Sequence, residues 1–221
     1  MFRVKPIAGI ILGTAIFAAL LFIPARTIDW PRAWIFLGLV LVGAALATFA
    51  ISEDLLDERF KLPLQRTQPL ADKIVLLAFI AAFIGTIILI PLDVFRFHLM
   101  GPPARLISLF GLLLFSAGWW LISAAMIANE FAAPVVKHQK ERGHHVIDRG
   151  PYRIVRHPMY CGVIPILIGM ALWFGSYAAA LAATVPIALR AMIEEKYLRR
   201  ELPGYEEYLT RIRYRLIPLV W

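Results

Sequence analysis

Runs of about 20 apolar residues recur along the chain and limit the folds that it can adopt. An α-helix rises about 1.5 Å per residue, so about 20 apolar residues cross the roughly 30 Å hydrocarbon core of a bilayer. We predict six such segments, at residues 6–25, 31–51, 73–91, 106–128, 158–174 and 177–193. The chain is therefore predicted to be an all-α integral membrane protein, a polytopic helical bundle.

The last two segments are shorter than the others and are joined by Gly175-Ser176. They are predicted to form a C-terminal helical hairpin whose helices span the bilayer fully or partly, which gives five to six transmembrane helices. The first segment follows Arg3 and Lys5 and resembles a signal peptide in this respect. Because no small-residue cleavage site follows it, we expect it to be retained as a span.

Composition excludes the main alternatives to a membrane protein. The chain is 60% hydrophobic and 17% charged, whereas a soluble domain is roughly 45–50% apolar and about 25% charged. A single cysteine, Cys161, excludes a disulfide scaffold. The net charge of +8 does not indicate nucleic acid binding, because the apolar runs leave no soluble domain to carry such a surface.

The positions of the basic residues predict the topology. Counted on alternate sides of the six segments, 19 Lys and Arg lie on one side and four on the other. Cytoplasmic loops carry the excess of Lys and Arg. Both termini and the two long polar segments are therefore predicted to be cytoplasmic, in a bacterial inner membrane.

The polar segment at residues 137–162 combines basic residues with histidines and with glycines and prolines that break helices. A basic loop that touches anionic lipid explains the charge alone. It does not explain the histidines and tyrosines. Metal binding is not expected, because the histidine spacings of six, one and twelve residues lack the helical register of metal ligands. Pro158 is suited to the first turn of the fifth span, whose free N–H groups would favour an anionic group.

A second polar segment follows the sixth apolar run. Arg190, Glu194 and Glu195 emerge from that run at membrane depth, where ionisable residues are costly and usually functional. Ion pairs exposed to solvent beyond the last span are the alternative. Farther on, Tyr205, Tyr208, Leu209 and Ile212 fall at helical spacing. They predict a cytoplasmic amphipathic helix on the membrane surface, anchored by residues 216–221.

These residues together resemble a known family. The first part of the pattern is Gly150-Pro151-Tyr152-Arg153-x-x-Arg156-His157-Pro158-x-Tyr160-x-Gly162. The second part is Arg190-x-x-x-Glu194-Glu195, then Leu202-Pro203-Gly204-Tyr205-x-x-Tyr208. The pattern resembles the isoprenylcysteine carboxyl methyltransferase family, whose bacterial members share this C-terminal module with the phospholipid N-methyltransferases. The resemblance covers about residues 129–221, so we expect a C-terminal methyltransferase module there and four N-terminal spans in residues 1–128.

The resemblance implies S-adenosylmethionine as the cofactor, and it implies site residues position by position. The cofactor-side wall would consist of His145, Val146, Gly150, Tyr152, Arg156, His157, Tyr160 and Gly162. The opposite clamp would be Glu194 and Glu195, and the substrate side Asn129, Gln139 and Arg190. The residues expected to act in catalysis are Arg190, Glu194 and His157.

Methyl transfer is an in-line displacement, so alignment and exclusion of water are the main tasks of such an enzyme. The acceptor is expected to be lipophilic, with carboxylate O-methylation favoured over amine N-methylation. An NADPH-dependent sterol or steroid reductase has a similar module, but an asparagine and a glutamate would then be expected where Met159 and Val163 stand. A non-catalytic membrane protein whose polar cluster binds lipid headgroups is the third hypothesis.

Overall fold

The chain forms two compact units, each built from three separate stretches of sequence. The computed structural model describes residues 4–60, 70–134, 139–182 and 185–221. The first unit consists of residues 1–51, 81–116 and 165–183, and the second of residues 52–80, 117–164 and 184–221. The division expected at residue 128, into N-terminal spans and a methyltransferase module, remains a prediction.

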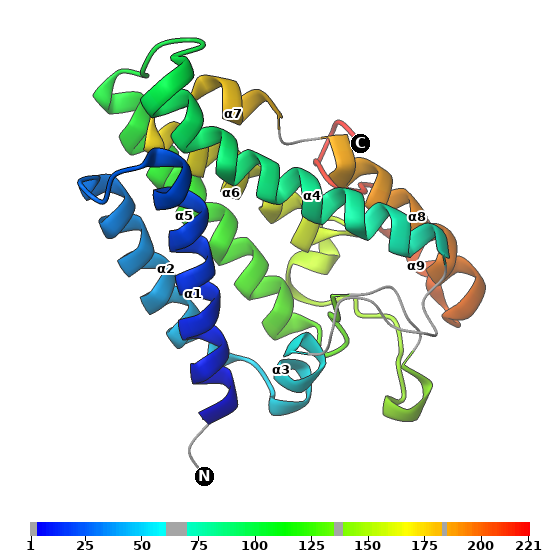
Figure 1. Ribbon diagram of the computed structural model, residues 1–221. Coiled ribbons are helices and arrows are strands. Elements are labelled where there is room, and N and C mark those ends of the chain that lie inside the picture. Colours follow the sequence, from blue (N-terminus) through cyan, green and yellow to red (C-terminus); the bar gives the residue numbers. More distant parts are fainter. Residues whose placement is uncertain (1–3, 61–69, 135–138, 183–184) are drawn as a thin grey trace. The chain divides into compact units, whose positions relative to one another are not determined.

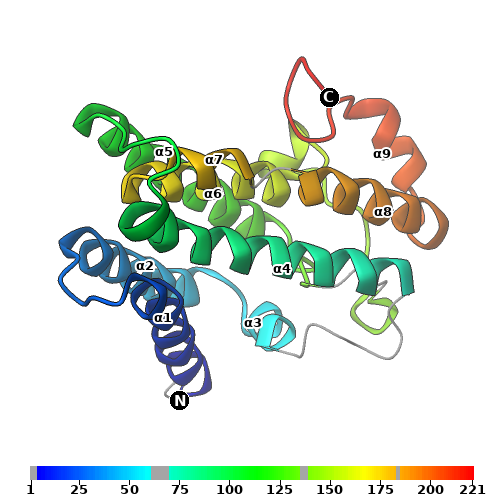
Figure 2. The same ribbon diagram turned by 45° about the horizontal axis from the view of Figure 1, so that its top comes forward.

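Four helices are long and apolar enough to cross a membrane. They are α1 (Val4–Ala25), α2 (Pro31–Ala50), α4 (Leu70–Leu92, continued by a π-helical turn at Asp93–Phe97) and α5 (Arg105–Ala128). Large apolar side chains such as Leu12, Phe49 and Leu113 point outward and are mostly exposed, as expected of helices in lipid. These helices confirm the first four predicted segments as helices of spanning length. Figures 1 and 2 show α1 and α2 side by side.

In the first unit, a turn at Gly175-Ser176 follows α6, and the hairpin predicted around it remains a prediction. The 17-residue apolar helix α6 (Pro158–Phe174) ends at Gly175, which adopts a φ of +102°. Ser176 N–H donates to Ala171 O at 2.9 Å and Gly175 N–H to Leu172 O at 3.2 Å, the pattern of a glycine-terminated helix. The Ser176 hydroxyl then accepts a hydrogen bond from Ala179 N–H at 3.0 Å and caps α7 (Tyr177–Ala182).

The described residues of the sixth predicted segment fall in α7 and in α8 (Val185–Glu201), and residues 183–184 between them lie outside the described part. The helix α8 ends eight residues beyond the predicted end at residue 193. Neither α7 nor α8 contains an apolar run of spanning length among the described residues. The apolar run ends before Glu194, but the helix continues through Glu194, Glu195 and Lys196, so the second half of α8 is polar.

The second unit is held together by the loop before α6 and the C-terminal segment. Val155 and Tyr214 form a parallel β-bridge, the only extended pairing among the described residues. Arg156 N–H donates to Tyr214 O at 2.9 Å, and His157 N–H donates to Arg215 O at 3.0 Å. The backbone that carries Arg156 and His157 is thereby fixed by residues almost 60 positions away.

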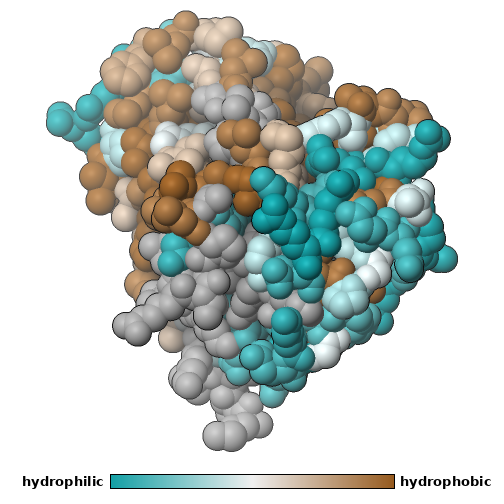
Figure 3. All heavy atoms as spheres, turned by 90° about the vertical axis from the view of Figure 1, so that its right-hand side faces the viewer, coloured by the Kyte–Doolittle hydropathy of each residue, from teal (hydrophilic) through white to brown (hydrophobic). Residues whose placement is uncertain are grey.

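The amphipathic helix predicted after Gly204 is α9 (Tyr205–Arg211). Its position on the membrane surface remains a prediction, and the structure gives its apolar face another role. Tyr205 and Tyr208 are buried with Leu202, and Val146 and Leu198 pack against them. On the face shown in Figure 3, hydrophilic residues gather in one area. In contrast to the buried tyrosines, the exposed side chains of α8 and α9 include Lys196, Arg199, Arg200, Glu206, Glu207 and Arg211.

Candidate functional site

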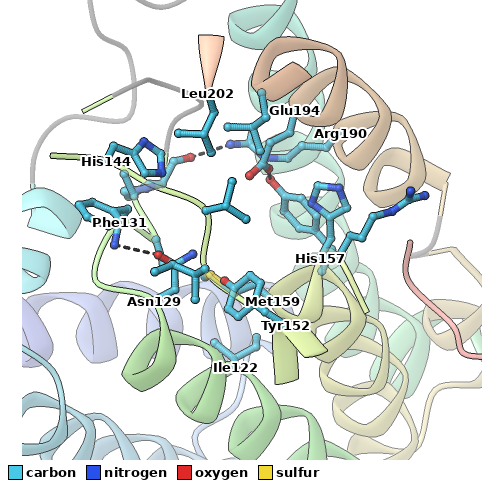
Figure 4. Close-up of a pocket in the computed structure, with 18 of the residues that line it drawn as sticks. Ile122, Asn129, Phe131, His144, Tyr152, His157, Met159, Arg190, Glu194 and Leu202 are labelled. Atoms are coloured by element: carbon cyan, nitrogen blue, oxygen red, sulfur yellow. Dashed lines mark hydrogen bonds between the residues drawn. The ribbon is translucent and has the colours of Figure 1, made fainter. Parts of the chain in front are cut away.

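A cavity of about 380 Å³ lies within the second unit. This volume falls within the range of small-molecule sites, roughly 300–1,000 Å³. Its walls come from α3 (Glu53–Phe60), α4, α5, the segment before α6, α6 itself, α8 and α9. In Figure 4, Arg190, Glu194 and His157 lie on one side, and Asn129, Phe131 and His144 lie on the other.

One side of the cavity is a chain of hydrogen bonds that begins at Arg190. Arg190 is buried, with 4% of its surface exposed. Its Nε donates to the Tyr160 hydroxyl at 2.9 Å, and its Nη2 donates to Pro134 O at 2.6 Å. The Tyr160 hydroxyl in turn donates to the Glu194 carboxylate. Tyr160, in the first turn of α6, therefore fixes the positions of two charged side chains from α8.

Glu195 lies behind the cavity wall and is 2% exposed. It accepts a hydrogen bond from Arg215 Nε at 2.7 Å, and its Oε2 lies 3.6 Å from both Arg156 Nη2 and His157 Nε2. Burial would raise the pKa of Glu195, but interactions with His157, Arg215 and Arg156 outweigh it and hold the pKa well below its usual range. Glu195 is therefore a permanent carboxylate that holds Arg156 and His157 in place, and it is unsuited to accept a proton.

Four polar atoms of the lining residues are buried without a hydrogen-bond partner among the described residues. They are Arg156 Nε, His157 Nε2, Arg190 Nη1 and the Tyr205 hydroxyl. Arg190 Nη1 lies 3.6 Å from Asp72 Oδ1, an ion pair without a hydrogen bond. Buried polar groups are nearly always hydrogen-bonded. Burial and the charges of Glu194 and Glu195 raise the pKa of Tyr205, so its hydroxyl remains a donor. His157 Nε2 and Arg190 Nη1 each lie 3.6 Å from a carboxylate that does not line the cavity, which leaves Arg156 Nε and the Tyr205 hydroxyl without a partner among the described residues.

The other side of the cavity is aromatic. The Phe131 ring lies 4.5 Å from the His144 ring and 5.2 Å from the His145 ring, between centroids. Asn129 Oδ1 accepts a hydrogen bond from Phe131 N–H at 2.9 Å, and Gln139 Nε2 donates to Phe131 O at 2.8 Å. Asn129 and Gln139 thus fix the backbone of Phe131, which presents a flat apolar face to the cavity.

Comparisons with known proteins find a matching family and similar curated proteins. Residues 106–203 match the phospholipid methyltransferase family. The chain is 29% identical over 103 residues to protein-S-isoprenylcysteine O-methyltransferase A of Arabidopsis thaliana. The aligned residues cover 46% of this chain and 48% of that protein. It is 31% identical over 112 residues to protein-S-isoprenylcysteine O-methyltransferase B of the same plant, 48% of this chain and 57% of that protein. The chain spans about half the length of these curated relatives.

The chain is related to the isoprenylcysteine carboxyl methyltransferases and to the phospholipid methyltransferases. The resemblance drawn from the sequence is thereby confirmed. All the site residues that the resemblance implied lie inside the segment matched to the phospholipid methyltransferase family.

The structure brings most of these methyltransferase-motif residues to the cavity. Those that line it are Asn129, His145, Val146, Tyr152, Arg156, His157, Tyr160, Arg190 and Glu194. Four others do not line it: Gln139, Gly150, Gly162 and Glu195. Gly150 adopts a left-handed φ of +57° and begins the short helix Gly150–Arg153. That short helix positions Tyr152 in the cavity wall. The backbone carbonyl of Tyr152 accepts a hydrogen bond from the Tyr208 hydroxyl at 2.8 Å.

Gly162 has a packing role in the structure rather than a place in the cavity wall. A Cβ at this position would lie 2.7 Å from Ile122 Cγ1 and 2.8 Å from Gly118 O. Gly162 therefore allows α6 and α5 to approach closely, as small residues do between membrane helices.

Several lining residues lie outside the methyltransferase segment, and the sequence interpretation missed them. They are Arg59 of α3, the α4 residues Leu76, Phe79 and Ile80, and the α9 residues Tyr205 and Tyr208. The helical spacing of the two tyrosines predicted an apolar helix face, but it did not predict that this face lines the cavity. Arg59 carried no distinguishing signal, because residues 52–73 contain three other basic residues. His144 and Phe131, within the segment, were also missed as lining residues.

Proposed function

We propose that the protein is an integral-membrane methyltransferase that uses S-adenosylmethionine and methylates a lipophilic acceptor. A carboxylate is the favoured acceptor group and an amine the second. The observation that carries the proposal is a cavity of small-molecule size with Arg156, His157, Tyr160, Arg190 and Glu194 in one part of its wall and apolar side chains in another. The relationship to two methyltransferase families supports it.

The lining residues fit the chemistry of this cofactor. S-adenosylmethionine carries a carboxylate, an ammonium, a sulfonium, a ribose and an adenine. Arg156, with an unsatisfied buried Nε, suits the carboxylate, and Glu194 suits the ammonium or a ribose hydroxyl. Phe131 and His144 offer flat faces to the adenine ring. Glu195 acts from behind by holding Arg156 and His157.

The cofactor would supply an electrophilic methyl group: the acceptor oxygen forms the new C–O bond while the C–S bond breaks and its electron pair stays on sulfur. The residues of the chain have to align the acceptor and exclude water. A carboxylate acceptor needs no general base. For an amine acceptor, His157 or Glu194 would receive the proton.

The apolar side of the cavity suits a lipophilic acceptor. Leu76, Phe79 and Ile80 from α4 face it together with Ile122 of α5 and Val163 of α6. All three helices carry apolar runs. An acyl or isoprenoid chain would bury its surface there at a gain of roughly 25 cal/mol per Å². The excess of basic residues in the loops that form this site favours the cytoplasmic face of a bacterial inner membrane, with both termini cytoplasmic.

Isothermal calorimetry of the purified protein in detergent tests the proposal. We expect saturable binding of S-adenosylhomocysteine, weakened about tenfold or more in His157→Ala, which removes a polar group from the cavity wall, and in Glu194→Gln, which removes its negative charge. Arg153→Gln, at an exposed residue outside the cavity, is the matched control and should bind as the wild type does. Binding of NADPH without binding of S-adenosylhomocysteine would refute the proposal and favour the reductase hypothesis.

A further inference from the structure

Arg215 does not line the cavity, yet it holds the carboxylate that lies behind the cavity wall. Its Nε donates to Glu195 Oε2 at 2.7 Å, and its Nη2 donates to Glu195 Oε1 at 3.3 Å. A guanidinium that engages both oxygens of a carboxylate fixes the plane of that carboxylate as well as its position. Arg215 lies beyond residues 106–203, the segment matched to the phospholipid methyltransferase family.

Glu195 connects Arg215 to two residues of the cavity wall. Its Oε2, which accepts the hydrogen bond from Arg215 Nε, lies 3.6 Å from Arg156 Nη2 and 3.6 Å from His157 Nε2. Both separations are longer than a hydrogen bond, so neither residue holds the carboxylate as firmly as Arg215 does. Arg199 also contacts Glu195, at 3.3 Å, but 47% of its side chain is exposed, and exposed ion pairs are weak.

The segment that carries Arg215 is itself held in place. Three consecutive backbone N–H groups, beginning with that of Arg215, donate to Trp221 O at 2.9, 3.0 and 3.2 Å. The Arg215 guanidinium lies over the Trp221 ring, with 4.7 Å between Cζ and the ring centroid. The backbone carbonyl of Arg215 accepts a hydrogen bond from His157 N–H at 3.0 Å. Arg215 therefore acts on His157 directly through its backbone and, by way of Glu195, through its side chain.

Loss of the Arg215 guanidinium would change the cavity wall. A buried carboxylate that loses its bidentate partner is left undercompensated and moves toward its remaining donors. The separations of 3.6 Å leave room for Glu195 to approach Arg156 or His157. Either residue would then turn toward Glu195 and away from the cavity. A displacement of about 1 Å in a site can cost about 10²-fold in rate.

We infer that Arg215 is a positioning residue, which fixes Glu195 and thereby sets where Arg156 and His157 lie in the cavity wall. The inference rests on the proposed function, because the ligand that this wall receives is taken to be S-adenosylmethionine. Arg215 does not itself face that ligand, since it lies outside the cavity lining. The geometry of the site is then completed by a segment outside the family match.

Calorimetry of S-adenosylhomocysteine binding to the whole chain in detergent tests the inference. We expect Arg215→Gln to weaken binding about tenfold, because the bidentate charged contact to Glu195 is lost. Arg215→Lys should bind with intermediate affinity, because lysine keeps the charge but lacks the planar pair of donors. Arg213→Gln, at an exposed arginine two positions earlier, is the matched control and should bind as the wild type does.

A double-mutant cycle separates positioning from packing. If Arg215 acts through Glu195, Arg215→Gln should cause no further loss of binding once Glu195→Gln is present. Additive losses would show that Arg215 supports the fold by another route, and they would overturn the inference. Wild-type affinity in Arg215→Gln, or an equal loss in Arg213→Gln, would overturn it too. If either glutamine variant does not fold, Arg215→Lys decides: a several-fold loss absent from Arg213→Gln supports the inference, and equal affinities overturn it.

The position of the His157 ring gives a readout that does not need the cofactor. The His157 and Tyr160 rings are stacked, with 5.8 Å between centroids and 26° between planes, so the His157 Cε1 proton senses the ring current of Tyr160. NMR of the protein labelled with ¹³C-histidine should show this resonance displaced in Arg215→Gln and unchanged in Arg213→Gln. A displaced resonance without S-adenosylhomocysteine binding by the wild type would refute the proposed function and leave the positioning role intact. Binding by the wild type with an unmoved resonance would overturn the positioning role alone.

Discussion

Replacement of Arg190 by glutamine is expected to lower kcat/KM for methyl transfer by about 10²–10³, the size of the loss when one preorganised charged donor is removed from an active site. Arg190 Nη1 is buried without a hydrogen-bond partner, while Nε and Nη2 are fixed by Tyr160 and Pro134. The side chain is thus held rigidly in the cavity wall, with Nη1 3.6 Å from Asp72 Oδ1. Glutamine keeps a polar side chain but loses the charge that aligns the acceptor.

The comparison with Arg190→Lys separates charge from geometry. Lysine keeps the charge but cannot replace a planar guanidinium that bonds Tyr160 and Pro134 at once. We expect intermediate activity with near-normal binding of S-adenosylhomocysteine. Arg153→Gln serves as the control. Wild-type kcat/KM in Arg190→Gln would contradict the role given to this residue.

Replacement of Gly162 by alanine is expected to destabilise the fold by about 1–3 kcal/mol, the usual cost of extra volume in a packed interior. The new Cβ would lie 2.8 Å from the carbonyl oxygen of Gly118, a backbone atom that cannot turn away as a side chain does. Thermal unfolding in detergent measures the effect. The dissociation constant for S-adenosylhomocysteine, measured below the transition, should change little.

Gly38→Ala is the matched control for this prediction. Gly38 also lies within an apolar helix, α2, but nothing lies within 4 Å of a Cβ added there. Alanine is the better helix former by about 1 kcal/mol, so Gly38→Ala should unfold at the same temperature as the wild type or higher. If Gly162→Ala loses cofactor binding and keeps its unfolding temperature, Gly162 has the cofactor role that the family resemblance implied, and the packing role is wrong.

The parts of the fold set by local chemistry were predictable from the sequence. Apolar runs alone give the first four long helices, because length and hydropathy decide which helices can span a bilayer. Gly175 and Ser176 gave the turn after α6, because only glycine readily takes the left-handed conformation there and serine caps the next helix. The motif residues from Asn129 to Glu194 gave most of the polar side of the cavity wall, though only nine of all its lining residues.

The parts that depend on tertiary contacts were not predictable. Glu194 and Glu195 are neighbours in a motif, but successive helical residues point in different directions. Only Glu194 therefore lines the cavity, while Glu195 lies behind it. Arg59 belongs to the cavity because α3 packs next to Phe131–Pro134, a contact across more than 70 residues. No local pattern in one sequence reports such a contact.

The central claim is that this protein transfers a methyl group to a lipophilic carboxylate. The most direct measurement is incubation of the purified protein with S-adenosylmethionine tritiated in the methyl group and a native membrane lipid extract, followed by base treatment of the lipid fraction. The account predicts label in the lipid fraction that base releases as methanol, and much less label with Glu194→Gln. Absence of label from the lipid fraction would contradict the methyltransferase assignment, and label that resists base would contradict the carboxylate acceptor.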